Sequence, residues 1–169
     1  MGRRTLHHQG NLNERSSQVS LMGQIYSKAQ LVLVWLGSDF RSEGASFSEM
    51  IHQLANQTVH NPNCMSGTPL DLNDPKSLSF LGLDTWQQSQ WLTLGLYLSR
   101  RWFRRLWCLQ EVLLARDMRA VCVLLGETMI SWPIFSLASA FMLDHQFQMA
   151  LSILVGNASG KMDLPVMPG

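Results

Sequence analysis

A run of apolar residues, Leu31 to Leu36, constrains the fold of this chain more than any other stretch. The run includes two valines, does not alternate with polar residues and stops at Gly37. Such a pattern is typical of a strand that is buried on both faces of a parallel sheet. Residues 13–29, directly before the run, carry apolar side chains at helical spacing: Val19, Met22, Ile25, Tyr26 and Ala29. A helix that leads into a buried strand predicts an α/β fold, with an open, mostly parallel sheet flanked by helices.

Periodicity and turn residues predict the remaining elements. Asp84 and Gln87 have the spacing of a capping box at the start of a helix. Residues 58–76 contain three prolines and should form a long surface loop. We expect helices over 44–57, 85–99 and 102–115, a strand over 119–125 that returns over 128–130, and a last helix after Ser131. The chain then divides into a poorly ordered segment at 1–10, one domain at 11–156 and a frayed tail at 157–169.

The composition excludes several classes of protein. Charged residues make up only 15% of the 169 residues, and a net charge of +1 gives no electrostatic reason to expect a nucleic-acid partner. The apolar run is far shorter than the roughly 20 residues needed to cross a bilayer, so we expect no membrane span. Cys64, Cys108 and Cys122 are odd in number and widely spaced, which predicts neither a disulfide framework nor a metal site. Without an apolar signal segment, the expected location is cytoplasmic.

Two segments carry long, ordered motifs. The first begins with Asn-Glu-Arg at 13–15 and ends with Val-Trp-Leu-Gly at 34–37. The second, at 101–112, reads Arg-Trp-Phe-Arg-Arg-Leu-Trp-Cys-Leu-Gln-Glu-Val. In their order and internal spacing, both resemble the signature blocks of the fungal heterokaryon incompatibility (HET) domain. The resemblance implies motif or structural roles for Glu14, Arg15, Gln18, Tyr26, Trp35, Gly37, Trp102, Phe103, Arg105, Trp107 and Gln110.

The chain departs from the family pattern at its front. A complete HET domain begins with two strands before the first motif, whereas here only His8 to Asn11 stand at the end of that region. The resemblance therefore implies a truncated domain without its front strands, or a chain whose first ten residues are a replacement. Loss of these strands would expose the flanks of the run from Leu31 to Leu36.

The resemblance also implies a candidate catalytic residue. The HET domain is distantly similar to the Toll/interleukin-receptor (TIR) fold, which implies a TIR-like sheet. In some TIR domains a helix glutamate within a W-C-x-x-E segment supports cleavage of the nicotinamide–ribose bond of NAD. Trp107 to Glu111 has that spacing, so Glu111 would act on NAD as substrate, and no cofactor is implied.

Helical geometry predicts where Glu111 lies. On one helix over 102–115, the core stripe would consist of Trp102, Leu106, Leu109 and Leu113. Glu111 would lie opposite this stripe, beside Arg104 and flanked by Trp107. The competing interpretation is a surface glutamate that pairs with an arginine, and under it the chain is not an enzyme.

The basic patch and the turn after the apolar run also allow two interpretations each. Arg101 and Arg104, which neighbour Arg100 and Arg105, are candidates to contact phosphate because a guanidinium fork suits phosphate oxygens. A solvated or salt-bridged helix start is the alternative. The segment Gly37 to Asp39 follows the predicted strand, where ligand loops lie in open α/β sheets, but we favour an ordinary strand-to-helix turn.

Three functions compete on this basis. The resemblance implies a signalling and interaction module of fungal self/non-self recognition, which acts through protein partners or homotypic assembly and is linked to programmed cell death. An NAD-cleaving hydrolase that uses Glu111 belongs to a different class. A non-functional truncated remnant is the third possibility, because missing strands would remove part of any nucleotide pocket.

Overall fold

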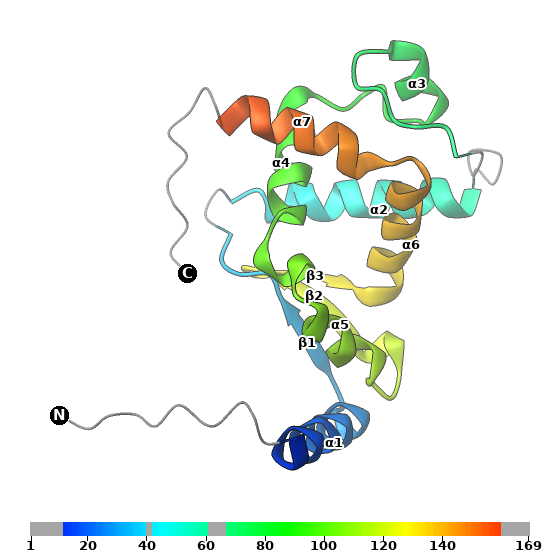
Figure 1. Ribbon diagram of the computed structural model, residues 1–169. Helices are drawn as coiled ribbons and strands as arrows, with labels where there is room; N and C mark the ends of the chain where they lie inside the picture. The colour runs from blue at the N-terminus through cyan, green and yellow to red at the C-terminus, as the bar shows by residue number, and fades with distance from the viewer. Residues whose placement is uncertain (1–11, 40–41, 61–66, 160–169) are drawn as a thin grey trace.

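The structure is a computed structural model that describes residues 12–39, 42–60 and 67–159, with side chains except at 12–15, 106–109 and 158–159. The predicted poorly ordered segment at 1–10 lies outside this description, as does the tail from residue 160. In chain order the elements are α1 (Leu12–Lys28), β1 (Val32–Trp35), α2 (Gly44–His60), α3 (Pro75–Phe80), α4 (Gln88–Leu98), η2 (Arg101–Arg104), α5 (Leu106–Leu113), η3 (Met118–Ala120), β2 (Val121–Leu125), β3 (Thr128–Ser131), α6 (Trp132–Asp144) and α7 (Phe147–Ser159) (Figure 1). Within the described ranges, no helix has the length and apolar character needed to span a membrane.

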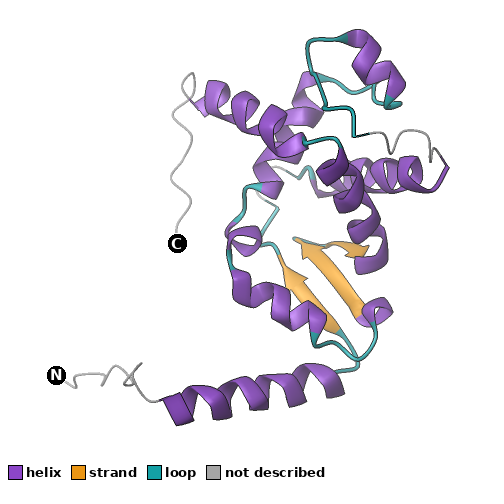
Figure 2. Cartoon of the chain, turned by 45° about the vertical axis from the view of Figure 1, so that its right-hand side comes forward, coloured by secondary structure: helices purple, strands orange, loops and turns teal. Residues whose placement is uncertain are grey.

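The three strands form one small open sheet in the order β1-β2-β3 (Figure 2). β1 and β2 pair in parallel, with Val34 opposite Val123, while β2 and β3 pair antiparallel, with Val123 opposite Ile130. The predicted α/β class is confirmed, but the prediction of a mostly parallel sheet is wrong, because the described strands form one pair of each kind. The antiparallel pair arises from the short hairpin turn at Gly126 and Glu127, which cannot connect parallel strands.

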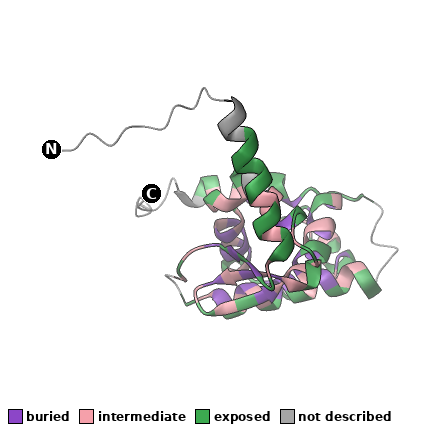
Figure 3. Cartoon of the chain, turned by 90° about the horizontal axis from the view of Figure 1, so that it is seen from below, coloured by how far each residue is buried: buried purple, intermediate pink, exposed green. Residues whose placement is uncertain are grey.

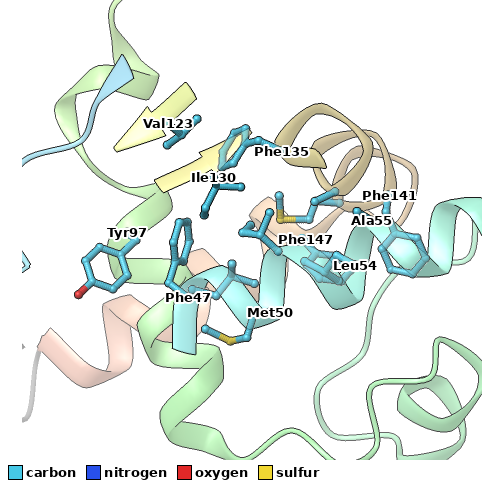
Figure 4. Close-up of a cluster of buried hydrophobic side chains, with 14 of the residues drawn as sticks. Phe47, Met50, Leu54, Ala55, Tyr97, Val123, Ile130, Phe135, Phe141 and Phe147 are labelled. Carbon is cyan, nitrogen blue, oxygen red and sulfur yellow. The ribbon is translucent and has the colours of Figure 1, made fainter. Parts of the chain in front are cut away.

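The hydrophobic core lies between one face of this sheet and the helices α2 and α6. Val34, Val123 and Ile130 lie in register across the sheet and are each 1% exposed. Figure 4 shows Val123 and Ile130 beside the side chains that the two helices contribute. The buried helix residues that surround them include Phe47, Met50, Ile51, Leu54, Phe135, Ala138 and Phe141.

The opposite face of the sheet is partly exposed, with Cys122 and Leu124 of β2 half-buried. Leu33 and Trp35 of β1 are 47% and 52% exposed, and Met129 of β3 is 59% exposed. The prediction that residues 31–36 form a strand buried on both faces is therefore wrong, because buried and exposed side chains alternate along β1. The face that carries Val34 packs into the core, whereas the face that carries Trp35 does not.

The apolar side of α1 is only partly covered. The helix has nearly its predicted bounds, and Met22 and Tyr26 are half-buried where α1 packs against α5. Leu21 and Ile25, one turn apart, remain 58% and 56% exposed. Figure 3 shows α1 from below as a largely exposed helix that extends away from the rest of the chain.

Two predicted helices differ from the structure. α4 begins at Gln88 rather than near 85, and the Gln90 side chain accepts a hydrogen bond from the Gln87 backbone N–H at 2.9 Å, so the cap is formed there and not by Asp84. The predicted single helix over 102–115 is wrong. Arg105 has an extended backbone conformation and separates η2 from α5.

A tight corner at His145 connects α6 to α7, a helix that the sequence analysis did not predict. His145 is fully buried, and its Nδ1 lies 2.7 Å from the Thr68 carbonyl oxygen, to which it donates a hydrogen bond. Its own backbone carbonyl accepts a bond of 2.8 Å from the Leu70 N–H. Leu70 is thereby buried, so the predicted surface loop at 58–76 is wrong for this part, and α2 and α3 shorten it at both ends.

We predict that Leu54→Ala lowers the free energy of unfolding by about 2–5 kcal/mol, because Leu54 is completely buried between α2 and α6 and its loss leaves a cavity. The matched control is Leu143→Ala on α6, which removes the same atoms from a side chain that is 63% exposed. The control should change stability by no more than about 0.5 kcal/mol. Denaturant unfolding followed by circular dichroism measures both, and equal losses would contradict the assigned core.

Candidate functional site

Polar side chains converge where β1 ends and α2 begins. Asp39 lies in the loop after β1, Glu43 directly precedes α2, and Tyr97 and Arg100 lie at and just beyond the end of α4. We refer to these four residues as the strand-end cluster. The place corresponds to the carboxyl ends of the parallel strands β1 and β2, where open α/β sheets hold their ligands.

Asp39 is the centre of the strand-end cluster. Its Oδ1 accepts a hydrogen bond of 3.0 Å from the Glu43 N–H, and its Oδ2 accepts one of 2.8 Å from the Gly44 N–H. Asp39 therefore satisfies two N–H groups at the start of α2, where a negative charge also stabilises the helix dipole. The Tyr97 hydroxyl donates a further bond of 2.7 Å to Oδ1, which joins α4 to the same carboxylate.

Arg100 and Thr93 add two more connections from the α4 side. Arg100 donates from Nη1 to the Leu36 carbonyl at 2.7 Å and from Nη2 to the Ser38 carbonyl at 3.0 Å. Its guanidinium carbon lies 4.8 Å from the centroid of the Tyr97 ring, a cation–π distance. Thr93 Oγ1 donates to Glu43 Oε2 at 2.9 Å.

Two glycines permit this close approach. Gly37 has φ 104° and Gly126 has φ 57°, both in the region that favours glycine. A Cβ atom at Gly37 would lie 2.7 Å from Arg100 Nη1, and one at Gly126 would lie 2.8 Å from Asp39 Cβ. The hairpin turn thus packs directly on Asp39, and the Gly126 N–H donates to the Gly37 carbonyl at 3.0 Å.

The environment keeps Tyr97 protonated. Burial raises the pKa of Tyr97 above its usual value, and the hydrogen bond to Asp39 and the negative charges of Asp39 and Glu43 act in the same direction. The positive charge of Arg100 opposes them and is the weakest of these influences. Tyr97 is therefore a hydrogen-bond donor at physiological pH and does not act as a general base.

The hydrogen bonds of the strand-end cluster are made within the protein itself. Asp39 accepts from backbone and tyrosine groups, and both Nη atoms of Arg100 bind backbone carbonyls. This arrangement supports a structural role, in which the cluster holds α2, α4 and the hairpin against the end of β1. It agrees with the interpretation of Gly37 to Asp39 as a strand-to-helix turn.

Glu111 lies on α5 and is partly exposed. Within the described part of the chain, its carboxylate forms no hydrogen bond and no ion pair, with Arg104 or with another residue. Its predicted geometry is wrong in two respects. Arg104 lies on η2 rather than on the same helix, and Leu113, placed in the core stripe, is 63% exposed. Among the described side chains of α5, Val112 is buried at 1% exposure, while those of Leu106 and Leu109, also in the predicted stripe, lie outside the described residues.

The other motif residues fall into four groups. Trp102 and Phe103 pack in an aromatic group with Trp132 and Phe135, with ring centroids 6.1 Å apart for Trp102–Trp132 and 5.8 Å apart for Phe103–Phe135. Tyr26 and Gln110 are half-buried, whereas the exposed group comprises Gln18, Trp35, Arg101, Arg104 and Arg105. The side chains of Glu14, Arg15 and Trp107 lie outside the described residues. Across the described ranges, His, Cys, Asp and Glu form no group that could hold a metal ion.

Sequence reasoning did not select Tyr97 and Arg100 as partners of the loop after β1. Nothing in the spacing distinguishes Arg100 from Arg101, Arg104 and Arg105, because its partners are carbonyls 64 and 62 residues away. Asp39 did carry a signal, since an aspartate shortly before a helix is typical of a capping residue. Tyr97 carried none, because its hydroxyl finds Asp39 only through the packing of α4 against α2.

We predict that Tyr97→Phe lowers the free energy of unfolding by about 1.5–3 kcal/mol, because it removes a hydrogen bond to a charged acceptor and leaves Asp39 less well satisfied. The aromatic contact with Phe47, at 5.1 Å between ring centroids, is retained. The control is Ser136→Ala, which removes an exposed hydroxyl bonded to the Pro133 carbonyl and should have little effect. If Tyr97→Phe and the native chain have the same free energy of unfolding in urea, the hydrogen bond from Tyr97 to Asp39 does not stabilise the fold.

Comparison with known proteins gives one finding on the family. No curated protein and no solved structure matches the chain. Residues 8–111 match the family model described as heterokaryon incompatibility protein (HET), and the matched stretch contains β1, α2, α4 and the whole strand-end cluster. Since the match covers more than half of the 169 residues and agrees with the motifs in the sequence, the chain belongs to the heterokaryon incompatibility (HET) family.

Proposed function

We propose that this chain is a signalling and interaction module of fungal self/non-self recognition, which acts through protein partners and leads to programmed cell death. The family membership supports the heterokaryon incompatibility role. The observation that carries the interaction role is the exposed apolar surface, which includes Leu21, Ile25, Leu33, Trp35 and Met129. Large exposed apolar patches on a domain are typical of surfaces that bind other proteins.

The proposed setting is the cytoplasm, and the proposed fold relationship is to TIR domains. The parallel pair β1–β2, separated in sequence by helices, supports a doubly wound relationship of that kind. The internal hydrogen bonds of the strand-end cluster also favour a binding module over an enzyme that uses the ends of the strands. In this proposal the cluster gives rigidity, and the apolar surface makes the contacts.

A second candidate function is hydrolysis of NAD, and one observation favours it. The Glu111 carboxylate is half-buried and makes no hydrogen bond or ion pair to the rest of the described chain. In this alternative, Glu111 stabilises the positive charge that develops on the ribose as nicotinamide leaves and water attacks. Arg101 and Arg104, both exposed on η2, would bind the phosphates.

We predict that expression of the chain in a filamentous fungus lowers cell viability, and that Glu111→Gln retains this effect. The substitution is nearly isosteric at a partly exposed position, so the free energy of unfolding should change by at most about 0.5 kcal/mol. The matched control is Glu49→Gln, the same change at an exposed position on α2. Viability counts, thermal melts and nicotinamide release from NAD are measured side by side for the three chains.

The outcomes separate the two candidate functions. A Glu111→Gln chain that melts normally and still kills, without nicotinamide release from the native chain, supports the interaction module. Loss of both killing and nicotinamide release in Glu111→Gln alone would replace the proposal by the hydrolase. Full viability of cells that accumulate the folded native chain would overturn both.

A further inference from the structure

Two apolar surfaces are exposed in the described part of the chain. The first, which we name the open sheet face, consists of Leu33, Trp35 and Met129, which are between 47% and 59% exposed. The second, the α1 ridge, consists of Leu21 and Ile25, at 58% and 56% exposure. Both contain large side chains that ordinarily lie in a core or an interface.

The open sheet face is continuous across the strands. The register places Trp35 opposite Leu124 and Leu124 opposite Met129, so one row of apolar side chains crosses all three strands. The next row contains Leu33 and Cys122. Neither row contains a charged residue, so this face suits an apolar partner and not an ionic one.

The described side chains of α1 carry little charge. Residues 16–28 include one charged side chain, Lys28, at the end next to β1. Beside Leu21, the exposed side chains of Ser16, Ser17, Ser20 and Gln24 are small or flexible and carry no charge.

We propose that a second copy of this chain covers both surfaces, so that the α1 ridge of each copy packs on the open sheet face of the other. The inference deepens the proposed function, on which its biological meaning rests, by naming the partner of the interaction module. A helix laid on the second face of a sheet is the usual way to complete an α/β layer structure. Within a single copy, α1 lies beside α5 (Figure 1), and the side chains of both surfaces remain about half exposed.

The exposed area agrees with a stable dimer. A fully exposed large apolar or aromatic side chain presents about 200 Å². The two surfaces, with the flanking Val19 and Leu31 at 46% and 52% exposure, comprise seven side chains that are each about half exposed. They offer roughly 700 Å² per copy, close to the about 800 Å² per partner of a standard protein interface. When both junctions form between the same two copies, the contact closes with twofold symmetry, whereas one junction per pair would continue into an open filament.

The test measures molar mass by size exclusion with light scattering on the purified chain at about 100 µM, where dissociation constants in the micromolar range are detected. The native chain should elute at twice its monomer mass of 19.1 kDa. Leu21→Glu on α1 and Trp35→Lys on β1 should each elute as folded monomers, with far-ultraviolet spectra like that of the native chain. The control is Ile153→Glu on α7, a charge at a side chain that is 65% exposed outside both surfaces, and it should remain dimeric.

A mixture of the two variants distinguishes reciprocal packing from general stickiness. In a mixed dimer one junction joins two native surfaces, and the other joins the new glutamate to the new lysine. Dimers should therefore return when Leu21→Glu and Trp35→Lys are combined. A monomeric native chain, dimers of either variant alone, or no recovery in the mixture would overturn the proposal. Because molar mass is measured independently of cell death, a monomeric native chain would contradict the dimer but not the proposed function. A dimer that does not kill cells would contradict the proposed function but not the interface.

Discussion

The carboxylate of Asp39 holds together elements that are distant in the chain. It binds the first N–H groups of α2, accepts the hydroxyl of Tyr97 from α4, and lies against Gly126 of the hairpin turn. These three contacts meet at the end of β1. The helices that form the core, α2 above all, take their position from this point, since α2 begins directly at the carboxylate.

The same contacts explain why this region does not resemble an open ligand site. A hydrogen-bond acceptor that already receives two backbone N–H groups and a tyrosine hydroxyl has little capacity for a substrate. The two Nη atoms of Arg100 donate to the carbonyls of Leu36 and Ser38. The family motifs that border the cluster therefore contribute to folding at this point, and Glu111 on α5 lies apart from the cluster in sequence and in element.

The sheet in turn shows how far the core extends. Val34, Val123 and Ile130 are buried against helices, whereas Leu33, Trp35 and Met129, on the other face, are not. Such a one-sided sheet is ordinary for antiparallel strands but unusual for a strand as apolar as β1. The apolar run suits two covered faces, and the single chain covers one. The proposed second copy would cover the other face.

The sequence by itself determined the elements that depend on local patterns. Helical spacing placed α1 and α2 within a few residues, the β2–β3 hairpin followed from strand residues around a glycine turn, and the two motifs identified the family. Local patterns could not reveal the break at Arg105 or the corner at His145, because neither position differs in residue type from a helix interior. They also missed α7, since a helix of low charge without a clear capping residue has no local start signal.

Only the tertiary structure decided which apolar residues are buried and which polar residues meet. Leu113 and Trp35 carry the same apolar signal as Val112 and Val34, yet the first two are exposed and the last two are buried. A hydrophobic side chain favours burial, but whether it is buried depends on the layers that the other helices and strands form around it. Tyr97 and Asp39 are 58 residues apart, and their hydrogen bond exists because α4 packs beside α2. Contacts at that separation depend on the whole fold, and no local pattern encodes them.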